Sequence, residues 1–243
     1  MNLVMPMAGR GSRFVDAGFA TPKPLIDVRG KPMYAWATAS LPLGLATRLI
    51  FICLREHLAD GSLESDIRTR YPMHDVVIVP LDTVTRGQAE TVLAAKAYID
   101  NDSPLVIFNA DTYVESNLAG HLATLPAHVD GVFGVFSAPG DKWSFARTDA
   151  HGRVVETAEK RRISEWASTG LYHFARGADF VRHTEAMIAA DDRERGEFYV
   201  APVYNRLIRE NAHIVLDIAT HVWVLGTPED LAHFEANYRG AVP

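Results

Sequence analysis

The sequence predicts an α/β fold built on a parallel, doubly wound sheet. Short runs rich in β-branched and aromatic residues alternate with stretches whose apolar residues have helical spacing, over 243 residues. The first run, residues 1–7, leads directly into a glycine-rich loop, as strands do at the ligand-binding edge of open sheets. The length suits one large α/β unit, so we expect a single domain over residues 1–243.

Composition and charge exclude several classes of protein. The hydrophobic content of 48% and charged content of 22% are those of an ordinary globular protein. The formal net charge of −6 argues against a broad nucleic-acid-binding surface. No basic segment precedes an apolar one at the N-terminus, and no apolar run approaches the length of a membrane span. We therefore expect a cytoplasmic protein without nucleic-acid or membrane partners.

Hydrophobic runs and turn signals place the elements of the first part of the chain. The strands are expected at residues 1–7, 48–54, 75–80, 104–108 and 131–136. The helices between them are expected at residues 32–41 and 89–99, with a helix or helical turn at 55–70, and residues 8–24 form a long loop. Cys53, the one cysteine, lies in an apolar run and is expected in the core, without a disulfide partner.

The second part of the chain should open with a hairpin. Its arms are residues 142–149 and 153–160, joined by a turn at Ala150-His151-Gly152. Further strands are expected at 167–174, 214–218 and 221–225, with helices at about 177–190 and after 205. A terminal helix follows Gly226, with Thr227 at its N-cap and Pro228 at its first turn.

The loop after the first strand has the residues of a phosphate-binding site. Its glycines, Gly9 and Gly11, let backbone N–H groups approach an anion, and Arg13 can pair with phosphate oxygens. Lys23 adds a positive charge between two prolines that fix its backbone before a ligand arrives. The candidate nucleotide-binding residues here are Ala8, Gly9, Gly11 and Ser12, with Arg13 and Lys23 as catalytic candidates.

A tight turn with a surface lysine is the competing interpretation of this loop. The loop matches neither the dinucleotide fingerprint nor the Walker pattern, because no Gly-Lys-Ser/Thr follows. The complete string favours phosphate binding, since G-x-G-S-R-F is followed by P-K-P-L and then by G-K-P-M.

Two later turns follow strands that should end at the same edge of the sheet. Gly87 and Gln88 open a helix, and the Gln88 amide can donate and accept as a base edge requires, although an incidental glutamine is the alternative. Asp111 follows the strand at 104–108, where its carboxylate could hold a magnesium ion that bridges phosphates. A turn aspartate or helix N-cap would explain Asp111 without a ligand.

The amino-terminal string resembles the signature of the nucleotidyltransferase family, which includes sugar-phosphate nucleotidylyltransferases and small CTP-dependent cytidylyltransferases. The resemblance covers nearly the whole chain, and its wording is closest to capsule-type cytidylyltransferases of the phosphoglutamine kind. It implies a Rossmann-like mixed α/β fold of the GT-A type with a small acceptor-side hairpin. It also implies that a nucleoside triphosphate condenses with a phosphorylated acceptor and releases pyrophosphate, with Mg²⁺ as cofactor.

The resemblance also implies roles for individual residues. Asp111 matches the metal-binding aspartate, and Gly87 and Gln88 match the helix start that helps to bind the base. Glu159-Lys160 matches a pair whose lysine contacts the acceptor phosphate. Further along the chain, Gly170 matches a glycine-containing strand near the acceptor. Residues 1–136 would then form the nucleotide-binding half and residues 137–243 the acceptor-binding half.

The chain departs from the family pattern in two places. Arg161 replaces the usual proline after the Glu-Lys pair, and with Arg162 it is either an acceptor contact or part of a solvated surface. Val224 stands where many sugar nucleotidylyltransferases have a second metal-binding aspartate. Asp217 and Glu197 are the nearest alternatives, although one carboxylate with phosphate oxygens and waters also suffices for Mg²⁺.

The sequence therefore favours a Mg²⁺-dependent nucleotidylyltransferase, with CTP as the favoured nucleotide and capsule or cell-surface polysaccharide synthesis as the setting. A GT-A-type glycosyltransferase using a sugar nucleotide is the alternative, but Asn109-Ala110-Asp111 is only half of its metal motif. A catalytically silent relative is a third hypothesis, and the retained basic residues and Asp111 argue against it. The acceptor and the oligomeric state, a homo-oligomer included, stay open.

Overall fold

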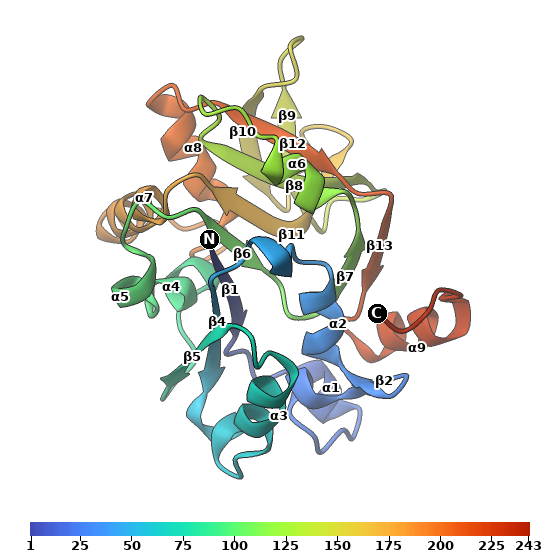
Figure 1. Cartoon of the computed structure of the whole chain (residues 1–243). Coiled ribbons are helices and arrows are strands. Elements are labelled where there is room, and N and C mark those ends of the chain that lie inside the picture. Colours follow the sequence, from blue (N-terminus) through green and yellow to red (C-terminus); the bar gives the residue numbers. More distant parts are fainter.

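The computed structural model describes all residues from 1 to 243 and shows a mixed sheet with helices on both faces (Figure 1). Seven strands follow the order β10-β9-β11-β6-β1-β4-β5, and β8 pairs with both β11 and β12 to complete a nine-stranded sheet. The strands are β1 (Asn2–Met7), β4 (Arg48–Leu54), β5 (Asp75–Leu81), β6 (Leu105–Phe108), β8 (Gly131–Ser137), β9 (Ser144–Thr148), β10 (Val154–Glu159), β11 (Trp166–Phe174) and β12 (Ile214–Ile218).

The α-helices are mostly short, and they connect strands across both faces of this sheet. They are α1 (Ser12–Asp16), α2 (Met33–Ala39), α3 (Ser62–Arg70), α4 (Gln88–Leu93), α5 (Lys96–Ile99), α6 (Leu118–Ala123), α7 (Gly177–Ala189), α8 (Ala201–Arg209) and α9 (Pro228–Asn237). Short 3₁₀ turns cover η1 (Lys23–Leu25), η2 (Leu43–Leu45) and η3 (Arg55–Leu58). None of the helices is both long and apolar enough to cross a membrane.

The central strands are apolar throughout because both of their faces are buried. Successive side chains of a strand point to opposite faces, so Ile50 and Ile52 pack with α4, α7 and α8. Their neighbours Leu49 and Phe51 pack with α2, α3 and α6 on the other face. This double burial explains why these strands read as continuous hydrophobic runs.

The strand order changes direction beside β1. From β1 the chain passes to β4 and β5 on one side, and then returns to β6 on the other side of β1. The pairs β1–β4, β4–β5 and β1–β6 are all parallel, whereas β11 runs antiparallel to β6. The carboxyl ends of β1 and β6 therefore lie side by side at a topological switch point, where open α/β sheets bind ligands.

Two small sheets flank the main one. β13 (His221–Val224) pairs antiparallel with β7 (Thr112–Glu115), and β2 (Asp27–Val28) pairs with β3 (Lys31–Pro32). An aromatic cluster joins α2 to α9, with Trp36 edge-on to Phe234 and to Tyr238 at ring separations of 4.9 and 5.3 Å. This packing brings the β13–α9 junction beside the end of β6.

The fold class, the mixed sheet and the antiparallel hairpin of β9 and β10 are confirmed. Several expectations about elements were wrong in detail. The supposed loop 8–24 contains α1 and the start of η1, and the helix expected after residue 205 is α8, which already begins at Ala201. The helix or helical turn expected at 55–70 is η3 followed by α3. The expected helix 89–99 breaks at Ala94 and Ala95 into α4 and α5, and β7 and α6 were not expected at all.

Candidate active site

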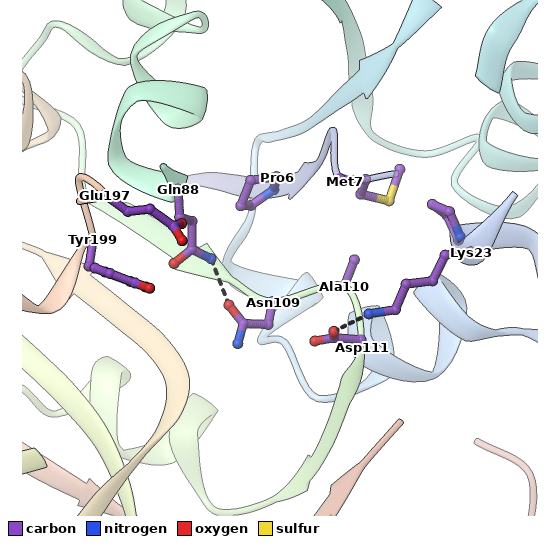
Figure 2. Close-up of a pocket in the computed structure, with 11 residues that line it drawn as sticks. Pro6, Met7, Lys23, Gln88, Asn109, Ala110, Asp111, Glu197 and Tyr199 are labelled. Atoms are coloured by element: carbon purple, nitrogen blue, oxygen red, sulfur yellow. Dashed lines mark hydrogen bonds and ion pairs between the residues drawn. The ribbon is translucent and has the colours of Figure 1, made fainter. Parts of the chain in front are cut away.

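A cavity of about 280 Å³ opens at the switch point between β1 and β6. Figure 2 shows its lining, which comes from segments far apart in the sequence. The residues are Pro6, Met7, Gly9, Lys23, Pro24, Gln88, Asn109, Ala110, Asp111, Glu197 and Tyr199. We call this the first cavity.

Lys23 and Asp111 face each other across one end of the first cavity. The Lys23 Nζ lies 2.5 Å from Oδ2 of Asp111, and their side chains are 21% and 29% exposed. Partial burial strengthens such a pair relative to a surface ion pair, because less water screens the charges. The loop and the strand end proposed for phosphate and metal binding thus share one cleft.

Gly11 has no side chain, which leaves room for the Lys23 side chain beside it. Its φ of +62° is left-handed, and a Cβ at this position would lie 2.8 Å from Cβ of Lys23. A side chain here would therefore strain the backbone and also displace the lysine. Lys23 itself begins the 3₁₀ turn η1, whose second residue is Pro24.

Asp111 is held by its backbone rather than by its side chain alone. Its carbonyl oxygen accepts a hydrogen bond of 2.8 Å from the Leu225 N–H at the end of β13. A Cβ on Gly226 would lie 3.5 Å from Oδ2 of Asp111 and 3.7 Å from Oδ2 of Asp230. The junction of β13 and α9 therefore packs against Asp111 and its carboxylate.

Two side-chain amides form the middle of the first cavity. The Gln88 Nε2 donates to Oδ1 of Asn109 at 2.6 Å, which orients both amides (Figure 2). Gly170 on β11 has a φ of +82°, and a Cβ there would meet Nδ2 of Asn109 at 2.2 Å. Gly170 therefore allows the Asn109 amide to lie directly against β11.

A second cavity of about 190 Å³ shares Gln88, Asn109 and Tyr199 with the first. Its other lining residues are mostly polar and come from the hairpin, β11, β7 and β13. They are Thr112, Lys142, Trp143, Ser144, Glu159, Ser168, Thr169, Gly170, Tyr172, Val222 and Val224. Because the two cavities adjoin, two ligands could meet at the residues that they share.

Glu159 is the acidic group of the second cavity. It is 7% exposed and accepts a short hydrogen bond from the Ser144 hydroxyl. Burial raises the pKa of this carboxyl, and the Ser144 hydrogen bond and the Lys160 charge offset only part of that rise. The carboxylate can accept hydrogen bonds from hydroxyl groups of a ligand.

Lys160 lies beside the cavities but lines neither. Its Nζ donates to the Tyr199 hydroxyl at 2.8 Å, and Tyr199 lines both cavities. The hydrogen bond to Tyr199 raises the pKa of Lys160, so the side chain carries its charge at neutral pH.

The two arginines after Lys160 make contacts within the protein. Arg161 pairs with Glu156 at 2.9 Å, and Arg162 donates to the carbonyl oxygens of Ala138 and Gly140 at 2.6 and 2.9 Å. Both arginines are exposed, as the interpretation of this run as a solvated surface expects.

Several candidates from the sequence lie outside both cavities. Ser12 and Arg13 are exposed on α1. Hydrogen bonds from its own N–H and from Thr227 lower the pKa of Glu229 on α9, and the Arg13 charge lowers it further. Ala8 is buried in the core. A Cβ on Gly87 would lie 2.5 Å from the Phe198 backbone, so this glycine makes room for the protein chain.

Only one of the two alternatives for a second metal-binding carboxylate lies in a cavity with Asp111. Asp217 accepts a 3.0 Å contact from His121 and lines neither cavity. Glu197 lines the first cavity together with Asp111. No group of three or more His, Cys, Asp or Glu side chains comes together as a metal site.

Sequence reasoning missed Asn109, Ser144 and Tyr199. Asn109 directly follows the strand at 105–108, so its place at the strand end could have identified it. Ser144 and Tyr199 reach the cavities only through tertiary packing of the hairpin and of the segment before α8, and no local pattern marks them.

Comparison with known proteins agrees with this architecture. The family model for nucleotidyl transferases matches residues 3–239, whereas no curated protein matches the chain. A nucleoside-diphosphate-sugar pyrophosphorylase from Vibrio cholerae RC9 is 33% identical, covers 97% of this chain and 100% of its own, and superposes with a TM-score of 0.82.

A second solved structure shares the fold at lower identity. It is described as a candidate glucose-1-phosphate thymidylyltransferase from Bacillus anthracis, in complex with sucrose. It is 18% identical, with coverage of 100% of this chain and 98% of its own and a TM-score of 0.82. The family model spans nearly the whole chain, and the protein therefore belongs to the nucleotidyl transferase family.

Proposed function

We propose that the protein transfers a nucleotidyl group from a nucleoside triphosphate to a phosphorylated small molecule and releases pyrophosphate. The single observation that carries this proposal is the position of Lys23 and Asp111, 2.5 Å apart in a cavity that adjoins a second, polar cavity. One cavity would take the nucleotide and the other the acceptor. This assigns nucleotide binding mainly to residues 1–136 and acceptor binding mainly to residues 137–243.

The first cavity has groups for each part of a nucleotide. Lys23 provides the charge for the phosphates, with the backbone of Gly9 and Gly11 alongside it. Ser12 and Arg13, which are exposed on α1 directly after these glycines, would meet the far end of the phosphate chain. Gln88, at the helix start after Gly87, would contact the base.

The donor set of the first cavity fits Mg²⁺. Magnesium commonly binds one or two carboxylates and completes its shell with phosphate oxygens and waters. Asp111 would be the ligand, and Glu197, in the same cavity, is the available second carboxylate. When bound, the ion would neutralise developing charge on the phosphates.

The second cavity suits an acceptor that carries hydroxyl groups. Glu159 can accept from such groups, Gly170 leaves room beside Asn109, and Lys160 supplies a positive charge through the Tyr199 edge of the cavity. The name of the Vibrio cholerae relative, a nucleoside-diphosphate-sugar pyrophosphorylase, supports a sugar phosphate. CTP remains our favoured nucleotide, and capsule or cell-surface polysaccharide synthesis the favoured setting.

The reaction needs positioning and charge neutralisation more than proton transfer. A phosphate oxygen of the acceptor forms a bond to the α-phosphorus, and the bond from that phosphorus to the oxygen bridging to the β-phosphate breaks. Pyrophosphate leaves with the electron pair. Because the acceptor phosphate is already ionised near neutral pH, no general base is required, and orientation by the protein supplies the acceleration.

A panel of four nucleoside triphosphates, each with glucose 1-phosphate, a polyol phosphate and phosphocholine, tests the proposal. Pyrophosphate release is measured by coupled phosphate detection in the presence of Mg²⁺. We expect release only when both a triphosphate and a hydroxylated acceptor are present. No release with any pair, together with consumption of UDP-glucose, would identify a glycosyltransferase instead.

A further inference from the structure

Tyr199 occupies the boundary between the two cavities and contacts the lysine assigned to the acceptor phosphate. Its hydroxyl accepts a hydrogen bond of 2.8 Å from Nζ of Lys160, and its ring centroid lies 5.0 Å from the same atom. Figure 2 shows the Tyr199 ring extending into the first cavity on the side opposite Lys23. Lys160 thus reaches the cavities only through this tyrosine.

The backbone fixes the direction of Lys160. Its φ of +48° is left-handed, a conformation that is uncommon for a lysine. Its N–H donates to the Trp143 carbonyl at 2.9 Å, and Arg195 donates to its carbonyl at 3.2 Å. These two contacts hold the backbone of Lys160 on both sides of its Cα, beside Tyr199.

The segment that carries Tyr199 is tied to the same strand end. Glu194 and Glu197 form an isolated bridge, which closes a tight turn just before Tyr199. The Glu194 carboxylate accepts a hydrogen bond of 2.9 Å from the N–H of Glu159. Strand β10 and the segment before α8 are therefore hydrogen-bonded to each other beside the Lys160–Tyr199 contact.

The Tyr199 hydroxyl can donate a hydrogen bond as well as accept the one from Lys160. A phenolic oxygen that accepts from an ammonium group still has its own O–H to donate. A tyrosine phenol ordinarily loses its proton only at about pH 10, so this proton is present at neutral pH. A donor at the shared edge of two cavities is well placed for an anionic oxygen.

We propose that Tyr199 is a positioning residue that holds the Lys160 ammonium and donates its own O–H to a phosphate oxygen at the junction of the two cavities. This inference rests on the proposed function, because it places the acceptor phosphate there. Tyr199 would orient the attacking oxygen and hold it against the nucleotide, while Lys160 balances its charge.

Tyr199→Phe tests this role, because it removes the hydroxyl and keeps the ring beneath the Lys160 ammonium. We expect the KM for the acceptor to rise about tenfold, the equivalent of about 1.4 kcal/mol. The KM for the triphosphate should change less than twofold. Lys160→Met should give a similar rise, and the double variant should be no worse than either single one, because the two groups act through each other.

Tyr98→Phe is the matched control, since Tyr98 also lies beneath a cation, Arg48 at 5.6 Å, but lines neither cavity. It should leave both KM values unchanged. Additive effects of the Tyr199 and Lys160 changes, or an equal rise in both KM values for Tyr199→Phe, would overturn the proposal.

Binding of inorganic phosphate, followed by ³¹P line broadening, separates this inference from the proposed function. The wild-type protein should bind phosphate several-fold more tightly than Tyr199→Phe even if no triphosphate is turned over. Equal binding by the two proteins, or no binding by the wild type, would contradict the assigned contact. Phosphate binding that depends on Tyr199 without pyrophosphate release would contradict only the proposed function.

Discussion

The Lys23 ammonium and the Asp111 carboxylate form an ion pair at 2.5 Å, although 88 residues separate them in the sequence. The Lys23 ammonium can bind a phosphate group, and the Asp111 carboxylate can bind a cation. A magnesium–triphosphate complex would satisfy both charges together. In the absence of such a complex, the pair keeps two partly buried charges neutralised.

Removing either member of this pair should abolish pyrophosphate release. We expect Lys23→Ala and Asp111→Ala each to lower the rate at least about a hundredfold, because charge stabilisation at a transition state is worth that much or more. The measurement is kcat by coupled pyrophosphate detection, with circular dichroism to check folding. Near-normal turnover in either variant would contradict the assigned roles.

An ion pair of the same length elsewhere on the protein supplies the control. Lys96 lies 2.5 Å from Glu185, with both side chains nearly half exposed, and neither residue lines the first or the second cavity. Lys96→Ala should leave turnover unchanged and alter stability by less than about 1 kcal/mol, as expected of a surface pair.

Gly170→Ala should disturb the amide pair that the two cavities share. The left-handed φ of +82° and the overlap with Asn109 at 2.2 Å both oppose a methyl group. Strain costs about 1–2 kcal/mol and overpacking about 1–3 kcal/mol, so thermal unfolding should show a loss near their sum. Gly140→Ala, with a φ of +78° and open space around it, should show the strain alone. Equal losses in the two variants would mean that Asn109 moves away freely.

The central strands were predictable because strands buried on both faces are continuous apolar runs in the sequence. β4, at Arg48–Leu54, has the bounds expected from its sequence, since every residue after Arg48 is apolar and buried. β7 was missed because it is only four residues long and has the polar residues Thr112 and Glu115 at its ends. Its only partner, β13, comes more than a hundred residues later, so no local pattern could identify the pair.

In the candidate site too, residues with a local sequence signature were predictable and contacts set by tertiary structure were not. Lys23 and Asp111 could be named because a proline-flanked lysine and a carboxylate after a strand have local signatures. Their 2.5 Å contact depends on β1 and β6 being neighbours, which only the strand order decides. Tyr199 has no such signature, because its importance comes from Lys160, which lies 39 residues earlier.

Glu159→Gln should weaken acceptor binding while it removes a source of instability. Burial raises the pKa of this carboxyl, so the folded protein favours its protonated form. As the pH rises from the unfolded pKa through the folded one, ionisation of Glu159 therefore costs the wild type stability that the amide variant keeps. We expect the acceptor KM to rise, and the stability of the variant relative to wild type to increase from pH 4 to pH 7 in urea titrations. A relative stability that falls with pH would show that the carboxylate is stabilised by its surroundings.

His173 should make the protein sensitive to acid. It is 3% exposed on β11 with no partner for Nδ1, and burial lowers its pKa to about 4. A histidine whose pKa is lower in the folded state resists protonation there, so the stability it contributes is complete above about pH 6.5 and is lost as the pH falls toward 4. The loss should approach about 1.4 kcal/mol per pH unit in that window. His173→Gln should flatten the dependence, measured as unfolding free energy in urea at half-unit pH steps, whereas His151→Gln, in the exposed turn between β9 and β10, should leave it unchanged. Parallel curves for wild type and His173→Gln would assign the acid sensitivity to another group.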